Sequence, residues 1–202
     1  LTLLLGTPVL SLVGAIGVIG ASAKASIRDL VQGTGADYIV QSSIQFGAAA
    51  GVPDEALAAI EDVAGVGQVS TLAFDEAHID GADGTEGVQA SDDGYVSTIL
   101  GLKPVEGTVD AVPAGSVLVS QSLADDEDIA VGQRLDLRYS TSQSSSLRVA
   151  GIFEDNALAN NLIVPIAERA KFLDQDVQIA FVTLAAGADA KAVQSALDEA
   201  LA

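Results

Sequence analysis

The segment VQIAFVTL, residues 177–184, decides the fold of this chain. Its β-branched and aromatic residues predict a strand that is buried in a sheet. Gly-Ala-Asp at 187–189 predicts a turn, and residues 190–201 carry apolar side chains at helical spacing. The C-terminal end of the chain is therefore predicted to be a strand followed by a helix.

A similar unit is predicted near the other end of the chain. Residues 36–41 (ADYIVQ) read as a buried strand, and Pro-Asp-Glu at 53–55 opens a helix. Proline and acidic residues suit the free N–H groups and the dipole of a first helical turn. Residues 69–74 are the predicted return strand. Strand–helix units at both ends predict one α+β subdomain, a split strand–helix arrangement into which the middle is inserted.

The middle of the chain has a different pattern. Short apolar runs at 117–120, 134–139 and 147–153 are separated by Gly, Pro, Asp and Ser clusters. This spacing predicts a small, mostly antiparallel β module, with a hairpin loop at 140–146 (STSQSSS) and a short helix at 123–129. We therefore expect the α+β subdomain at residues 36–79 and 156–202, and the inserted β subdomain at residues 80–155.

The first residues predict where the protein resides. No residue from 1 to 23 is charged, and at about 1.5 Å rise per residue this run reaches roughly 30–35 Å, enough to cross a bilayer core. Gly14, Gly17 and Gly20 have the spacing by which membrane helices approach closely. Residues 1–23 are thus predicted to be the C-terminal part of a transmembrane helix, continued by a stalk helix at 24–35.

Two alternatives stand beside the membrane helix. Ala21-Ser22-Ala23 resembles a signal-peptide cleavage site, and a buried core helix is the third interpretation. The membrane helix and the signal peptide both place the following domain outside the cytoplasm. The expected location is the cell membrane, with the domain on its extracytoplasmic side.

The composition excludes several classes of function. The chain has 28 acidic and 9 basic residues, a formal charge of −19, and no run of Lys and Arg that would release counterions from a phosphate backbone. Nucleic-acid binding is therefore excluded, and the acidity fits solubility or salt adaptation. No cysteine is present, which excludes disulfides, thiolate zinc sites and cysteine nucleophiles.

The sequence contains no recognisable motif for catalysis, cofactor binding or metal binding. His78 is the single histidine and is interpreted as a half-exposed histidine at a strand end, because no G-x-S-x-G elbow supplies a nucleophile. The acidic clusters at 80–87 and 125–128 lack the spacing of a calcium loop and are interpreted as a turn and a solvated helix face. No Walker A or dinucleotide motif occurs. We assign no catalytic, cofactor-binding or metal-binding residue.

Several weak motifs, taken in order, resemble the FtsX/MacB-type permeases of ABC transporters, with the MacB-like periplasmic core as the nearest description. The segments that carry the resemblance are VGAIGVIGASAKASIRDLV (13–31), GADYIVQ (35–41), LAAIEDVAGVGQVSTL (57–72), VLVSQSLADDEDIAVGQRLDL (117–137), LRVAGIFED (147–155) and LIVPIAERAKF (162–172). The chain departs from the family at SDDGY (91–95), where the usual strand is blurred.

The resemblance implies a non-catalytic domain outside the membrane that couples a cytoplasmic ABC ATPase to substrate or partner handling. It also implies a permease homodimer, and a lipid, lipoprotein, peptide or cell-wall protein as what is handled. The gene is then expected to continue past Ala202 into further apolar runs of about twenty residues. The rival hypotheses are a secreted or membrane-anchored binding module with a signal peptide, and a secreted hydrolase that uses His78.

Overall fold

The computed structural model describes residues 2–4, 10–12, 35–41, 44–45, 48–49 and 51–201. Most of the predicted membrane helix and stalk lies outside these residues. Strands β1 (Thr2–Leu4) and β2 (Leu10–Leu12) pair antiparallel, so at these positions the backbone bonds across strands where a helix was predicted. Among the described residues, no helix has the length and apolar content that a membrane span requires. The membrane helix stays a prediction.

The chain forms two compact units. The first consists of Leu1–Thr71 and Asp176–Ala202, and the second of Leu72–Gln175. The second unit is wider at both ends than the insert expected at 80–155. The reason is strand pairing: β6 (Val66–Ile79) ends in the second unit, and β12 (Leu162–Pro165) belongs to the sheet of that unit.

The sheet of the first unit is built from segments far apart in sequence. Strand β3 (Tyr38–Gln41) pairs antiparallel with β13 (Ile179–Leu184), with Phe181 opposite Ile39. The first part of β6 lies on the other side of β13. These strands confirm the prediction at both ends of the chain, although Val177 forms only an isolated bridge to Val52. Two short strands, β4 (Ile44–Gln45) and β5 (Ala48–Ala49), form a separate pair.

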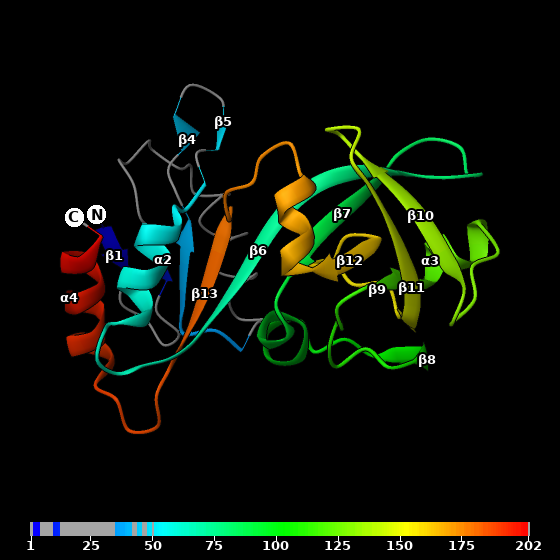
Figure 1. The fold of residues 1–202 in the computed structure, drawn as a ribbon. Coiled ribbons are helices and arrows are strands. Elements are labelled where there is room, and N and C mark those ends of the chain that lie inside the picture. Colours follow the sequence, from blue (N-terminus) through cyan, green and yellow to red (C-terminus); the bar gives the residue numbers. More distant parts are fainter. Residues whose placement is uncertain are drawn as a thin grey trace. The chain divides into compact units, whose positions relative to one another are not determined.

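Two helices share one core with this sheet, and Figure 1 draws both of them to the left of β13. Helix α2 (Asp54–Glu61) starts after Pro53 with acidic residues in its first turn, as predicted. Helix α4 (Ala190–Ala200) starts after Asp189, whose carboxylate caps its free N–H groups. The buried residues of this core are Tyr38, Val40, Val52, Leu57, Ile60, Val177, Ala180, Val182, Val193 and Leu197. The predicted α+β class is confirmed.

The second unit contains a closed ring of strands. The neighbours in order are β10 (Arg134–Tyr139), β11 (Ser144–Phe153), β9 (Ser116–Ser120), β12, β7 (Glu86–Ser91) and the second part of β6. A further pairing of β10 with β6, with Leu137 opposite Ile79, joins the two ends of this order. Pairs β12–β7 and β11–β9 are parallel, and the others are antiparallel. The predicted β module is thus a small mixed barrel.

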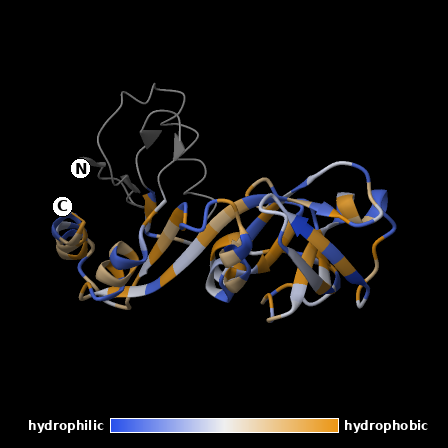
Figure 2. Ribbon diagram, turned by 45° about the horizontal axis from the view of Figure 1, so that its top comes forward, coloured by the Kyte–Doolittle hydropathy of each residue, from blue (hydrophilic) through white to orange (hydrophobic). Residues whose placement is uncertain are grey.

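Side chains point alternately into and out of this barrel, and the inward ones fill it. Along β10 the residues are exposed and buried in turn, as the period of a strand requires. Figure 2 shows the matching alternation of hydrophilic and hydrophobic residues in the strands of this unit. Ala77 lies opposite Tyr139, whose ring centroid is 5.3 Å from that of Phe172, and all three residues belong to the core of this unit.

Two predicted boundaries in this unit were wrong. Helix α3 (Gln121–Asp126) begins before the predicted 123–129, because the Ser120 hydroxyl accepts a hydrogen bond from Leu123 N and caps it there. It ends before Asp128, whose φ of 53° is left-handed. Strand β11 starts at Ser144, inside the predicted loop of 140–146, because the buried Ser145 hydroxyl finds partners on a neighbouring helix.

The stretch that departs from the family pattern is a strand end followed by a helix. Strand β7 ends at Ser91, and the Asp92 carboxylate accepts a hydrogen bond from Tyr95 N at 2.8 Å. A π-helix, η1 (Tyr95–Leu100), follows and leads to the exposed strand β8 (Pro104–Gly107), which pairs with β11. The 3₁₀ helix η2 (Ile166–Lys171) follows β12.

Candidate functional site

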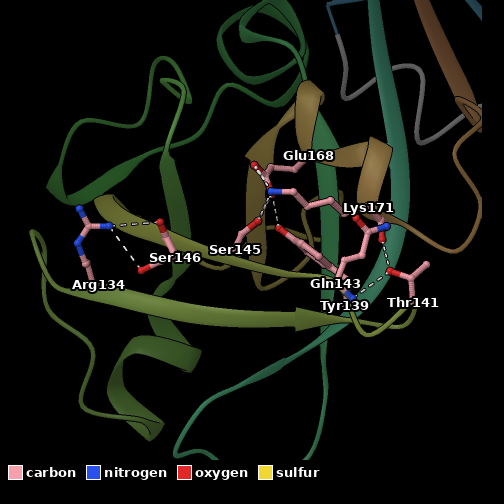
Figure 3. A network of polar contacts seen from close by, with 8 residues as sticks. All are labelled: Arg134, Tyr139, Thr141, Gln143, Ser145, Ser146, Glu168 and Lys171. Atoms are coloured by element: carbon pink, nitrogen blue, oxygen red, sulfur yellow. Dashed lines mark hydrogen bonds and ion pairs between the residues drawn. The ribbon is translucent and has the colours of Figure 1, made fainter.

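A network of polar side chains joins helix η2 to the hairpin of β10 and β11. Its centre is Glu168, whose side chain is only 14% exposed. The Tyr139 hydroxyl donates a hydrogen bond to Glu168 Oε2 at 2.9 Å, and the Ser145 hydroxyl donates a second to the same oxygen. Lys171 Nζ donates to both carboxylate oxygens, at 3.0 and 3.2 Å. Figure 3 shows these side chains meeting.

Lysine 171 ties the network to the loop between the two strands. Its ammonium also donates to the Ser145 Oγ at 2.6 Å. Its backbone carbonyl accepts from the Thr141 hydroxyl at 2.5 Å, and Thr141 Oγ1 in turn accepts from Gln143 N at 3.3 Å. The helix and the hairpin loop are thus held by both backbone and side-chain contacts.

The electrostatics of this network fix two protonation states. Burial of the Glu168 carboxyl opposes ionisation, but hydrogen bonds from Ser145, Lys171 and Tyr139 outweigh it and lower the pKa of Glu168 below its usual value. Burial raises the pKa of Tyr139 well above its usual value, and the Glu168 charge adds to this effect. At neutral pH the carboxylate is ionised and the phenol is protonated.

The Ser145–Lys171 contact has the geometry of a serine nucleophile beside a lysine base. A lysine base needs a neutral amine with a free lone pair. Here the Lys171 nitrogen donates to a carboxylate, and the Ser145 proton is also directed at Glu168. A charge-assisted network of this kind stabilises the contact between helix and hairpin. The arrangement fits a structural clamp.

The outer face of the same hairpin is lined by charged and hydroxyl side chains. Strand β10 exposes Arg134, Asp136 and Arg138, and β11 exposes Arg148. A shallow pocket of about 340 Å³ lies there. It is lined by Asp80, Asp136, Leu137, Arg138, Ser144, Ser145 and Ser146.

Two of these arginines are held by hydrogen bonds. Arg134 Nη1 donates to the Ser146 carbonyl at 3.3 Å and to its hydroxyl at 3.5 Å, contacts drawn in Figure 3. Arg148 Nη1 donates to the Gly132 carbonyl at 3.1 Å. Arg134 lies directly opposite Arg148 in the register of the hairpin. The sequence shows no run of Lys and Arg, so this patch exists only once the hairpin has formed.

His78 occupies a structural position. Its ring is half-buried near the end of β6, opposite Arg138. The Nδ1 nitrogen lies 2.7 Å from the Gly84 carbonyl, so Nδ1 carries the proton and donates to it. The contact closes the turn between β6 and β7. This geometry accords with the interpretation of His78 as a strand-end histidine.

The two acidic clusters lie on different elements of the second unit. Asp80 and Asp83 lie in the turn between β6 and β7, and Glu86 accepts a hydrogen bond from Asn161 Nδ2 at 2.6 Å. Asp125 and Asp126 are exposed at the end of α3. Within the part of the chain that the structure describes, no three His, Asp or Glu side chains are grouped to hold a metal ion.

Sequence reasoning did not find the network around Glu168. Glu168 and Lys171 are three residues apart on one helix, which is a visible signal for an ion pair. Their partners Tyr139 and Ser145 lie 29 and 23 residues away from Glu168. Only the closed barrel brings them together.

The family profile of the MacB-like periplasmic core domain matches residues 1–200. This chain belongs to that family. The resemblance noted in the sequence is thereby confirmed, and the MacB-like core described here is an extracytoplasmic domain of the MacB/FtsX-like ABC permease family. No curated protein matches the chain in sequence.

Three solved structures share the fold of this MacB-like core. The periplasmic region of MacB from Actinobacillus actinomycetemcomitans has 14% identity and a TM-score of 0.57, and 81% of this chain and 80% of that chain are covered. A domain of a permease protein from Porphyromonas gingivalis has 22% identity, a TM-score of 0.52 and coverages of 74% and 75%. The extracellular domain of the noncanonic ABC-type transporter YknZ from Gram-positive bacteria has 16% identity, a TM-score of 0.51 and coverages of 71% and 76%.

Proposed function

We propose that this domain couples a cytoplasmic ABC ATPase to the handling of a substrate or partner protein outside the membrane, and that it does so without catalysis. The observation that carries the proposal is the match of the MacB-like periplasmic core family over residues 1–200. The material handled is a lipid, lipoprotein, peptide or cell-wall protein, and the working form is a homodimeric permease in the cell membrane.

The division of the chain supports a coupling role. The first unit contains both the N-terminal and the C-terminal parts of the domain, while the second unit is one continuous segment, Leu72–Gln175. In a permease whose membrane helices flank this domain, both helices attach to the first unit. Motion of the helices can then reach the second unit through the two chain crossings, at 71–72 and 175–176.

The polar groups of the described residues support a non-catalytic role. The single histidine donates to a backbone carbonyl, and Ser145 and Lys171 are both engaged by Glu168. Transport by the full-length permease is therefore expected to be unchanged by His78→Ala. Loss of transport without loss of folding would instead support catalytic use of the imidazole.

Location is tested by cysteine labelling, since residues 1–202 contain no cysteine and the unsubstituted full-length protein gives the background of labelling. Leu173 is 75% exposed, whereas Ala90 is fully buried. In cells that express the full-length gene, Leu173→Cys is expected to react with a membrane-impermeant maleimide, and Ala90→Cys only after denaturation. Labelling of Leu173→Cys only after lysis would contradict an extracytoplasmic location.

Coupling is tested by purifying the full-length gene product in detergent. We expect an ABC ATPase to copurify and its hydrolysis rate to depend on the permease. A mature chain that starts at Lys24, without a bound ATPase, would instead support a secreted binding module.

A further inference from the structure

The basic residues of this acidic chain are unevenly placed. Of nine Lys and Arg residues in the sequence, Arg134, Arg138 and Arg148 lie on the outer face of the β10–β11 hairpin. We call these three residues the arginine face. None of them forms an ion pair with an Asp or Glu of the described residues, whereas Lys103 pairs with Glu154 and Lys171 with Glu168. The arginine face gathers three of the nine basic residues of a protein of charge −19, and Asp136 and Asp80 lie beside Arg138 in the lining of the same pocket.

The stability of the barrel does not explain this arrangement. Arg134 and Arg148 are directly opposite each other in the antiparallel register. Side chains in such a pair have Cβ atoms about 5 Å apart, and like charges at this distance destabilise a sheet. Arg134 reaches toward Ser146 and Arg148 toward Gly132, in opposite directions along the hairpin, and an anionic group bound against either guanidinium would offset the remaining repulsion.

The guanidinium groups are already oriented for an anion. Arg134 is fixed by its bonds to Ser146, and Arg148 by its bond to the Gly132 carbonyl. Each of these bonds uses one nitrogen, Nη1, which leaves further N–H groups for a ligand. The planar guanidinium matches the two oxygens of a carboxylate, and less conformational entropy is lost when the fork is already held.

The spacing of charge along β10 selects the class of anion. Arg134 and Arg138 are four residues apart on one strand, or roughly 13 Å at about 3.3 Å per residue. Asp136 lies between them on the same exposed face. A uniform polyanion, such as a nucleic acid, would place a negative group against Asp136. A polypeptide can instead alternate its charges.

We propose that the arginine face binds an acidic segment of a partner protein. Carboxylates of the partner lie against Arg134 with Arg148 and against Arg138, and a basic or neutral polar side chain lies against Asp136. The shallow pocket, lined by Arg138, Asp136 and the serines of β11, receives this central side chain. The proposal rests on the proposed function and deepens it, because it names the chemistry of a partner outside the membrane.

The test uses synthetic peptides and the intact chain. An extended peptide with the pattern Glu-x-Lys-x-Glu places its charges two residues apart on one face. Peptides with Lys-x-Glu-x-Lys and Glu-x-Glu-x-Glu serve as probes of charge order. Binding is measured by fluorescence anisotropy near 0.15 M salt. At this ionic strength the Debye length is about 8 Å, so long-range repulsion between the acidic protein and an acidic peptide is screened more than contacts at the arginine face. We expect Glu-x-Lys-x-Glu to bind most tightly.

Two variants with the same total change in charge locate the binding. Arg134→Glu with Arg138→Glu is expected to weaken binding of Glu-x-Lys-x-Glu at least tenfold. Lys103→Glu with Lys191→Glu reverses two exposed lysines elsewhere and is expected to leave the affinity within twofold. Equal losses in both double variants, or no binding of this peptide to the native chain, would overturn the proposal.

A charge swap tests the role of Asp136. The Asp136→Lys variant leaves three basic side chains and no acidic one on the exposed face of β10, so the preference is expected to change to Glu-x-Glu-x-Glu. An unchanged order of affinities would overturn the proposal, and this variant keeps the test decisive if the arginine double variant does not fold.

Self-association that is lost in the arginine double variant would assign the face to a second copy of the chain. Binding to anionic lipid vesicles without binding to peptide would assign it to the membrane. Either result overturns the partner assignment while leaving the ATPase coupling to its own test.

Discussion

The Tyr139 hydroxyl and the Glu168 carboxylate are joined by a 2.9 Å hydrogen bond that links strand β10 to helix η2. Both groups are shielded from water, and three donors converge on the carboxylate: Tyr139, Ser145 and Lys171. This contact holds the chain that follows the barrel against its hairpin. Its removal is therefore expected to affect the stability of the second unit.

Glu168→Gln is expected to reduce the free energy of unfolding by about 1–3 kcal/mol. The neutral amide cannot accept all three hydrogen bonds and leaves the Lys171 ammonium without its charge partner. Glu154→Gln is the matched control, because it removes the exposed ion pair with Lys103 at 3.5 Å and is expected to cost about 0.5 kcal/mol or less. Urea unfolding measures both. Equal effects would show that the network adds nothing beyond a surface ion pair.

The stability of the domain is expected to fall in acid partly through Glu168. Its pKa is lowered in the folded state, so the unfolded chain binds the proton more readily. The stabilisation is present above the ordinary glutamate pKa of about 4.3 and is lost as pH falls through the lower, folded pKa. Unfolding free energies measured from pH 6 to pH 3 should decline less steeply for Glu168→Gln than for the native chain. A parallel decline would contradict the assignment.

Tyr139→Phe tests the other end of the bond without disturbing the ring contact to Phe172. We expect a loss of about 1–2 kcal/mol, because the ring still packs while the hydrogen bond to the charged carboxylate is gone. Phe172→Leu is a useful comparison, since it removes the ring contact and keeps the hydrogen bond. If Tyr139→Phe had no effect in urea unfolding, the hydroxyl would contribute nothing to the clamp.

Gly151→Ala is expected to destabilise the second unit by about 1–3 kcal/mol, since overpacking against backbone cannot be relieved by rotamer changes. A Cβ at this position would lie 2.8 Å from the Thr108 carbonyl carbon and 2.9 Å from Val109 Cγ1. At Gly87 a Cβ would meet only the Asn160 side chain, at 3.3 Å. Gly87→Ala is therefore the control and should unfold near the native midpoint in urea.

Asp189→Ala is expected to cost about 1 kcal/mol in the first unit, because the carboxylate caps helix α4. Its Oδ1 accepts from Lys191 N at 2.9 Å and from Ala192 N at 3.4 Å. Asp189→Asn retains a capping oxygen and should keep most of the stability. Thermal unfolding followed by circular dichroism distinguishes the two, and an equal loss in both would point to charge rather than capping.

Elements with strong local patterns could be predicted from the sequence. Strand β10 has the boundaries predicted from the alternation in RLDLRY, and α4 follows its cap and apolar spacing closely. Strand β11 was predicted too short, because Ser144 and Ser145 look like loop residues until the partner of the buried hydroxyl is known. Whether polar residues such as these join a strand depends on tertiary contacts, which local sequence patterns do not contain.

The α+β class and the two strand–helix units at the ends could be predicted without a structure, because strand and helix periods are patterns among neighbouring residues. The acidic character follows from composition alone. That the middle is a closed mixed barrel is known only from the three-dimensional structure, since closure depends on Leu137 pairing with Ile79, and strands β7, β8 and β9 lie between them in the chain. The same closure places Glu168 against the hairpin. The pairing of β10 with β11 also sets Arg134 beside Arg148, 14 positions apart in the chain, and so forms the arginine face of an acidic protein.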